Sequence, residues 1–173
     1  MYNKSVAEHA KEVFPKHNVT CATAHSLAMK NVGWQYSICD NLKAKDIIDS
    51  GLMTAHKKGI GNYLQRAAQI LNTIETFMGS PDFEIEMEHV PLRWKEGNIK
   101  PEQRRIVLED TQKIWERMTA RNWPPKKDVE TMKLPHDGYL KLFQLKRPNL
   151  QDHAIHDVLM IDEGIFLFSI NLR

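Results

Sequence analysis

Apolar residues recur every three or four positions through the middle of the chain, a spacing that predicts helices. The strongest pattern spans residues 62–78, between Gly61 and Gly79. We expect its inward side to be formed by Leu64, Ala67, Ala68, Leu71, Ile74 and Met78. A second long helix should begin at Pro101, since proline is favoured at the first helical position, and should end before the sequence WPP at 123–125. Its expected inward residues are Val107, Leu108, Thr111, Trp115 and Met118.

Shorter helical patterns flank these two. Residues 41–57 form one of them, and HDGYLKLFQL at 136–145 forms another, with Asp137 as its expected cap. An Ala- and Met-rich helix nearer the start of the chain should end at Gly33. The first helix is predicted within YNKSVAEHAKEVFP, residues 2–15, whose final proline stops it. Its apolar side holds Val6, Ala7, Ala10, Val13 and Phe14.

Three stretches have the composition of strands. Residues 18–23 are rich in β-branched side chains and suit a brief strand. Residues 83–88 alternate apolar positions with glutamates, which predicts a half-buried strand or an extended segment. The apolar run at 157–162 is bounded like a buried parallel strand. The expected fold class is therefore α/β and mainly helical, with a helical insert between two pieces of one sheet.

Composition narrows the function only slightly. The 173 residues are 42% hydrophobic and 27% charged, which suits one globular domain, and the net charge of +2 neither supports nor excludes a nucleic-acid partner. The chain has no long apolar segment, so we expect no membrane association. Its two cysteines, Cys21 and Cys39, fit a reducing compartment, the cytosol or the nucleus. With His25 they match no structural zinc spacing.

The most informative short motif is VLMIDE at 158–163, an apolar run that closes on two adjacent carboxylates. An acid at the carboxyl end of a buried strand can meet a phosphate-bound Mg²⁺, and a second carboxylate can orient the attacking water. The same pattern also occurs at ordinary strand ends. A nucleotide site further requires a G-x-x-x-x-G-K-[ST] loop, and the chain offers only GIGN at 59–62, with no following Lys-Thr or Lys-Ser.

Three stretches, in order, resemble a known family. They are YNKSVAEHAKEVFP with the following VTCATAHSLAMKNVG, then LPHDGYLKLFQLKRP, and finally HDVLMIDE. The set resembles the UvrD-like superfamily 1 DNA helicases, and most closely their F-box DNA helicase branch. The first stretch is similar to motifs Ia and Ib, the second to a segment typical of the F-box branch, and the third to the Walker B strand. The resemblance covers roughly residues 2–163.

This resemblance implies a fold and a domain plan. It implies a partial RecA-like 1A sheet, with a 1A segment at 1–33, a helical 1B-like insert at 34–150 and the Walker B strand at 151–163. The remaining residues, 164–173, match nothing in the family and form an unrelated tail. The parent family uses ATP and Mg²⁺ to move along single-stranded DNA and unwind duplexes in recombination and repair. A nuclear location is expected.

The resemblance also implies roles for individual residues. Asp162 matches the Mg²⁺-binding acid, and Glu163 matches the residue that activates water. Thr23 and His25, in TAHSL, match positions along the DNA path, and Asn3 with Lys4 matches the tail of motif Ia. Ordinary structural roles remain open, with Thr23 as a strand residue and His25 as a helix cap. No role follows for His136 or Asp137.

The departures from the family pattern predict an interrupted site. The family continues the acidic pair with Ala-Gln-Asp, whereas Glu163 is followed here by GIFLF. We therefore expect a truncated segment of the first motor domain, inactive alone, binding neither ATP nor Mg²⁺, and binding single-stranded DNA weakly. The alternative is a non-catalytic helical module that binds DNA or protein, and a third possibility is a sequence with no independent role. The β-prone tail GIFLFSI should either leave strand edges unpaired or add itself to the sheet as a substitute strand.

Overall fold

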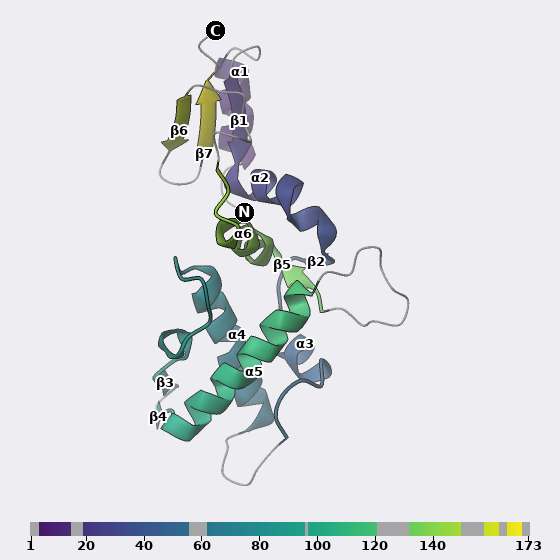
Figure 1. Cartoon of the computed structure of the whole chain (residues 1–173), viewed down its shortest axis with the longest axis vertical. Helices are drawn as coiled ribbons and strands as arrows, with labels where there is room; N and C mark the ends of the chain where they lie inside the picture. The colour runs from purple at the N-terminus through teal and green to yellow at the C-terminus, as the bar shows by residue number, and fades with distance from the viewer. Residues whose placement is uncertain are drawn as a thin grey trace. The chain divides into compact units, whose positions relative to one another are not determined.

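The computed structural model describes residues 4–14, 19–55, 62–95, 97–120, 132–149, 158–162 and 166–170, the last two ranges and Lys4 and Val6 by their backbone alone. The chain divides into two compact units. The first contains residues 1–34 and 142–173, and the second contains residues 35–141. Figure 1 traces their helices and strands. Each unit is described by itself below.

The first unit is built around a three-stranded sheet. Its strands are β1 (Val19–Thr23), β6 (Val158–Asp162) and β7 (Phe166–Ile170), in the order β1-β7-β6 (Figure 1). Both neighbours pair with β7 in antiparallel fashion, and Ile170 lies opposite Val19 on one side and Val158 on the other. The predicted strand at 18–23 is confirmed. Because β1 and β6 both run against β7, they run parallel to each other.

The pairing corrects one prediction and decides between two others. The run at 157–162 forms a strand, but its partner β7 is antiparallel, so the predicted parallel pairing is wrong. The tail supplies β7 and lies between the two predicted strands as a substitute strand. The sequence favours this outcome because FLFSI is uncharged and free of proline, and a central strand satisfies backbone groups on both of its edges.

Two helices complete the first unit. α1 (Lys4–Val13) packs against β1 through small side chains, since Ala7 and Ala10 are buried. Val13 is 62% exposed and Phe14 is also exposed, so their predicted inward placement is wrong. α2 (Ala24–Asn31) follows β1 directly and ends just before Gly33, where a 3₁₀ turn, η1 (Gly33–Gln35), begins. This agrees with the predicted end of the helix.

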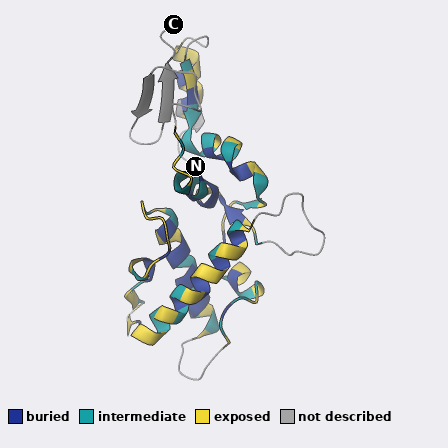
Figure 2. Ribbon diagram, in the orientation of Figure 1, coloured by how far each residue is buried: buried dark blue, intermediate teal, exposed yellow. Residues whose placement is uncertain are grey.

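The second unit is helical. Its elements α3 (Ala44–Asp49), α4 (Tyr63–Met78) and α5 (Pro101–Thr119) pack as neighbours, α4 contacting both of the others. Figure 2 shows α5 with one buried and one exposed side. The centre of the core is made of fully buried side chains, which are Ile47, Ala67, Ile70, Ile74, Val107 and Ile114. Apolar burial of this kind contributes about 1.5–3 kcal/mol for each large side chain.

The inward face of α4 is rotated from the predicted one. Leu64 is 58% exposed, and the buried face instead carries Arg66, Ala67, Gln69, Ile70, Thr73, Ile74 and Phe77. Three of these residues are polar, so an apolar stripe alone could not reveal them. On α5 the predicted positions Val107, Thr111 and Met118 are buried, together with Asp110 and Ile114. The predicted WPP break lies outside the described residues.

The helix predicted at 41–57 is much shorter. α3 begins at Ala44, where the backbone N–H of Lys43 donates to Asp46 Oδ2 at 2.8 Å. It ends at Asp49 because Ser50 Oγ donates to the Ile47 carbonyl and Gly51 adopts a φ of +66°. Such a left-handed conformation suits glycine and terminates helices.

Short strands link the helices of the second unit. β2 (Ile38–Cys39) pairs in parallel with β5 (Leu134–Pro135), and β3 (Arg93–Trp94) forms a hairpin with β4 (Gly97–Asn98). The alternating segment 83–88 is not a strand, because it leads into a 3₁₀ turn, η2 (Met87–His89). None of these short pairings follows from the sequence pattern.

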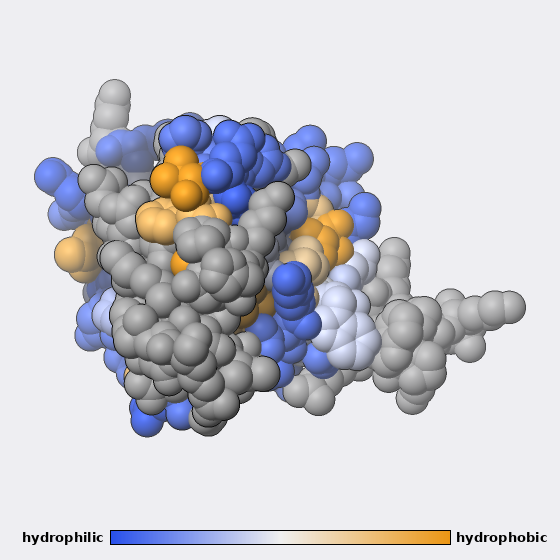
Figure 3. Space-filling view, turned by 90° about the horizontal axis from the view of Figure 1, so that it is seen from above, coloured by the Kyte–Doolittle hydropathy of each residue, from blue (hydrophilic) through white to orange (hydrophobic). Residues whose placement is uncertain are grey.

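α6 (His136–Leu145) occupies the predicted residues. Asp137 lies inside its first turn, so the predicted capping role is wrong, although an acid there still favours the helix dipole. Within the residues that the structure describes, no helix is long and apolar enough to span a bilayer. Figure 3 shows that hydrophilic residues dominate the described part of one face, with hydrophobic residues scattered among them.

Candidate functional site

The ends of β1 and β6 meet at the same edge of the sheet in the first unit. Thr23, the last residue of β1, pairs with Phe166, and Asp162, the last residue of β6, pairs with the same Phe166 from the other side. These three residues therefore form one row across the sheet. Neighbouring strands lie about 4.8 Å apart, and β7 lies between β1 and β6, so the backbones of Thr23 and Asp162 are roughly 10 Å apart across the sheet. The carboxyl ends of parallel strands are a common place for ligands in α/β proteins.

Thr23 joins the strand to the helix that follows. Its backbone is extended, with φ −79° and ψ 153°, and its Oγ1 accepts a hydrogen bond from the Ser26 N–H at 3.1 Å. In return, Ser26 Oγ donates to the Thr23 carbonyl at 2.8 Å. Thr23 is thus a strand residue, as one of its predicted roles had it, and it is also the N-cap of α2, a role that was not predicted for it. Threonine is a favoured N-cap residue, so the sequence already contained this signal.

The other predicted DNA contacts are placed less fully. His25 is half-buried in the first turn of α2, and the helix cap is Thr23, so the alternative in which His25 caps the helix is wrong. Lys4 is the first residue of α1, and Asn3 lies outside the described residues. Thr23 and His25 therefore share one strand–helix junction. Their contact with DNA remains a prediction.

The predicted acidic pair and the glycine-rich stretch lie largely outside the side chains that the structure describes. Across the parts of the chain with described side chains, no three His, Cys, Asp or Glu residues gather as metal ligands. Glu163 lies outside the described residues, and for Asp162 only the backbone position is known. GIGN at 59–62 also falls mainly outside them, and its one described residue, Asn62, caps α4 by accepting from the Leu64 N–H at 2.9 Å. Binding of a nucleotide or Mg²⁺ at Asp162 and Glu163 is therefore untested by the described residues and stays a prediction.

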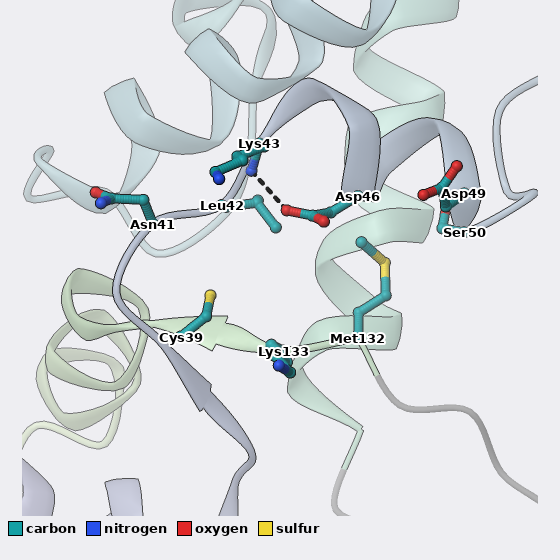
Figure 4. Close-up of a pocket in the computed structure, with 9 residues that line it drawn as sticks. All are labelled: Cys39, Asn41, Leu42, Lys43, Asp46, Asp49, Ser50, Met132 and Lys133. Carbon is teal, nitrogen blue, oxygen red and sulfur yellow. Dashed lines mark hydrogen bonds between the residues drawn. The ribbon is translucent and has the colours of Figure 1, made fainter.

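A pocket of about 370 Å³ lies in the second unit, between the β2–α3 connection and the start of β5. Figure 4 shows the thiol of Cys39, the thioether of Met132 and the side chain of Leu42 directed toward the same space. Two lysines and two aspartates surround them, which are Lys43, Lys133, Asp46 and Asp49. Because these charges are equal in number and opposite in sign, the pocket favours no ligand charge.

Burial makes the pocket thiol a poor nucleophile. Desolvation raises the pKa of Cys39, and the carboxylates of Asp46 and Asp40 raise it further against the opposing effect of Lys133. Desolvation also raises the pKa of Cys21 in β1, and the nearby Lys11 opposes this shift. Reactive cysteines have the opposite shift. The direction of both shifts is therefore opposite to the one that activates a thiol.

Fold and site together define the class of the chain at a coarse level. It is a mostly helical α/β protein whose small sheet brings two predicted functional positions to one edge. No protein-family model and no solved structure matches it. The chain is similar to F-box DNA helicase 1 of Gallus gallus, with 35% identity over 171 residues that cover 94% of this chain and 16% of that protein.

This similarity supports a helicase-related region. The chain spans about 16% of the length of the curated relative it matches, so the activity of that whole protein is not established for this chain. The similarity agrees with the resemblance that the three sequence stretches indicated. It does not extend to the UvrD-like motor-domain assignment or to the RecA-like sheet with its insert, which remain predictions.

Proposed function

We propose that this chain is a segment of the first motor domain of a UvrD-like DNA helicase, and that its strand–helix junction contributes to a path for single-stranded DNA. The similarity to F-box DNA helicase 1 over 94% of the chain carries the proposal. The shared sheet edge of Thr23 and Asp162 supports it, because a motor must place its DNA-contacting and metal-binding residues near one another. A role of this kind implies a nuclear location.

In this proposal the residues of this chain contact DNA but do not carry out nucleotide hydrolysis by themselves. His25 sits in the first turn of α2, whose N–H groups favour an anion such as a DNA phosphate. Thr23 fixes the start of that helix through its hydroxyl, so it positions His25 even where it does not touch DNA. Asp162 and Glu163 take the acidic roles of the family only in an intact motor. They require phosphates held in place, and the chain has no G-x-x-x-x-G-K-[ST] sequence to hold them.

The first test is ATP hydrolysis by the 173-residue chain. Phosphate release should stay at background with and without single-stranded DNA, because Asp162 and Glu163 have no positioned nucleotide to act upon. Glu163→Gln should therefore change nothing. DNA-stimulated turnover that disappears in Glu163→Gln would show that the acidic pair is active in this chain.

The second test is DNA binding, measured by fluorescence anisotropy with a labelled single strand. The expected dissociation constant is about 10⁻⁴ to 10⁻⁶ M near physiological salt, weakening steeply as salt rises. His25→Ala should weaken binding. His9→Ala is a matched control, since His9 is an exposed histidine of the same unit that contacts Glu12 at 3.8 Å on α1.

Thr23 needs a separate design because it also caps α2. Thr23→Ser keeps the capping hydroxyl, whereas Thr23→Ala removes it and should cost about 0.5–2 kcal/mol of stability. The double change Thr23→Ala with His25→Ala should bind most weakly of all. Binding that ignores salt, or that responds equally to His9→Ala and His25→Ala, would favour a non-catalytic module that binds a protein partner instead.

A further inference from the structure

Lys141 carries a buried positive charge in the second unit. Its side chain is 1% exposed, and its Nζ donates to the Ser80 carbonyl at 2.9 Å and to the Asp82 carbonyl at 2.6 Å. The same Nζ lies 4.2 Å from the centre of the Phe77 ring. The ammonium has thus exchanged its water shell for two carbonyls and an aromatic face. Burial lowers the pKa of Lys141, and Asp82 opposes that shift.

His89 contacts the side chains of the same turn, residues 80–82. Its Nε2 lies 3.0 Å from Asp82 Oδ2 and 3.1 Å from Ser80 Oγ. Its Nδ1 lies 3.0 Å from the backbone nitrogen of Glu86, whose N–H donates to it, and 3.3 Å from the Glu86 carbonyl oxygen. The imidazole also packs edge-on against Phe77, with ring centres 5.3 Å apart. In the turn 80–82, Lys141 therefore binds the backbone carbonyls of Ser80 and Asp82, and His89 contacts the side chains of the same two residues.

The start of α6 is fitted closely enough to keep Lys141 in place. A Cβ on Gly138 would lie 2.6 Å from Leu134 Cδ1, which explains why glycine occupies this position. Tyr139 is 3% exposed, and its hydroxyl lies 3.0 Å from His136 Nδ1. The other nitrogen of His136 lies 3.4 Å from Asp40, beside β2. Within the stretch LPHDGYLK, His136 and Lys141 thus contact residues outside it, near its start and at its end.

We propose that residues 134–141 form a conformational clasp. The clasp fastens the first half of α6 to residues 80–90, the segment that contains the turn 80–82 and His89. Lys141 is its central contact, and the two segments open and close together. α6 itself continues past residue 141, where the second unit ends, to Leu145.

Hydrogen exchange on the full chain tests the clasp. In the wild type, amides of 82–90 and of 139–141 should share one opening free energy, because hydrogen bonds that span 61 and 59 positions join the two segments. Lys141→Met keeps the length and apolar stem of the side chain but removes both hydrogen bonds. Protection of the turn should fall about tenfold or more, the effect of losing charge-assisted hydrogen bonds, and its opening should no longer match that of α6. Lys146→Met is the matched control, because Lys146 is an exposed lysine five residues after Lys141, and it should change neither.

A glycine pair tests the clasp from its other side. Gly138→Ala displaces Leu134, so it should open α6 and release the turn 82–90 with it. Gly97→Ala meets no atom within 4 Å and is the matched control. If the turn keeps its protection in both Lys141→Met and Gly138→Ala, the clasp does not exist. An equal loss throughout α4 and α5 in either variant would also overturn the proposal, because it would mean general destabilisation.

Discussion

Asp110→Asn should be among the most damaging conservative changes in the chain. The Asp110 side chain is fully buried, and so is Arg66, whose Nε lies 3.7 Å from Asp110 Oδ2. Asp110 also accepts hydrogen bonds from the Thr54 N–H at 3.0 Å and from Thr54 Oγ1 at 2.5 Å. Lys113 is the only other described cation near this carboxylate, at 3.8 Å, and it is half exposed. Asp110 is therefore the buried counter-charge that compensates the guanidinium of Arg66.

The magnitude follows from this geometry. At 3.7 Å and an effective dielectric constant of about 20, the attraction between the two charges is about 4.5 kcal/mol. Arg66 donates from Nη2 to the Thr54 carbonyl, but among the described residues no acceptor bonds its Nε or Nη1. Asparagine keeps one acceptor oxygen for Thr54 but replaces the other with an NH₂ donor and removes the charge, so the expected loss is about 3–5 kcal/mol. The total free energy of unfolding of a typical domain is only about 5–15 kcal/mol.

Urea titration followed by far-UV circular dichroism measures the effect. Glu109→Gln is the matched control, because Glu109 is the preceding residue on α5 and pairs with Arg105 at 3.2 Å on the surface. It should change stability by less than about 1 kcal/mol. The double change Arg66→Met with Asp110→Leu should recover part of the loss, since it leaves no lone buried charge. Equal midpoints for Asp110→Asn and Glu109→Gln would refute the reasoning.

Three further predictions concern the core, the thiols and the sheet. Ile74→Ala should cost about 2–5 kcal/mol because Ile74 is fully buried, whereas Leu64→Ala should cost little because Leu64 is 58% exposed; thermal unfolding compares them. Alkylation by iodoacetamide should be faster at half-buried Cys39 than at buried Cys21, and because burial raises the pKa of Cys39, its rate should still be rising with pH above 9.0. An inflection below 9.0 would contradict that direction. Ser169→Pro, in the middle of β7 opposite both Thr20 and Leu159, should remove the protection of β1 amides from hydrogen exchange, leaving α4 and α5 unchanged.

Sequence periodicity located the long helices well because their signal is local. α4, α5 and α6 begin and end within a few residues of the predicted limits. The inward face of α4 was missed because Arg66, Gln69 and Thr73 are buried beside the apolar residues. Arg66 is neutralised by Asp110, which holds Thr54 from 56 positions away. Such pairing between distant segments leaves no periodic trace in the sequence.

The candidate site was predictable only in part, for a related reason. The position of Thr23 at the end of a strand followed from local composition, and its capping role could have been recognised because threonine directly before a helix is a favoured N-cap. The contacts of Lys141 with Ser80 and Asp82 could not be predicted from the sequence, because they join residues 61 and 59 positions apart. The partner of β6 could not be chosen from sequence either, since strand patterns define faces and not neighbours.

The row Thr23–Phe166–Asp162 makes the tail strand part of the candidate site. β1 and β6 make no ladder with each other, and their carboxyl ends reach one edge because each pairs with β7. A change confined to β7 can therefore disturb both predicted functional positions without altering either residue. If Ser169→Pro weakens single-stranded DNA binding as much as His25→Ala does, the sheet organises the strand–helix junction. If binding is unaffected while β1 loses its protection, the Thr23 cap and α2 are sufficient, and the tail serves only to complete the sheet.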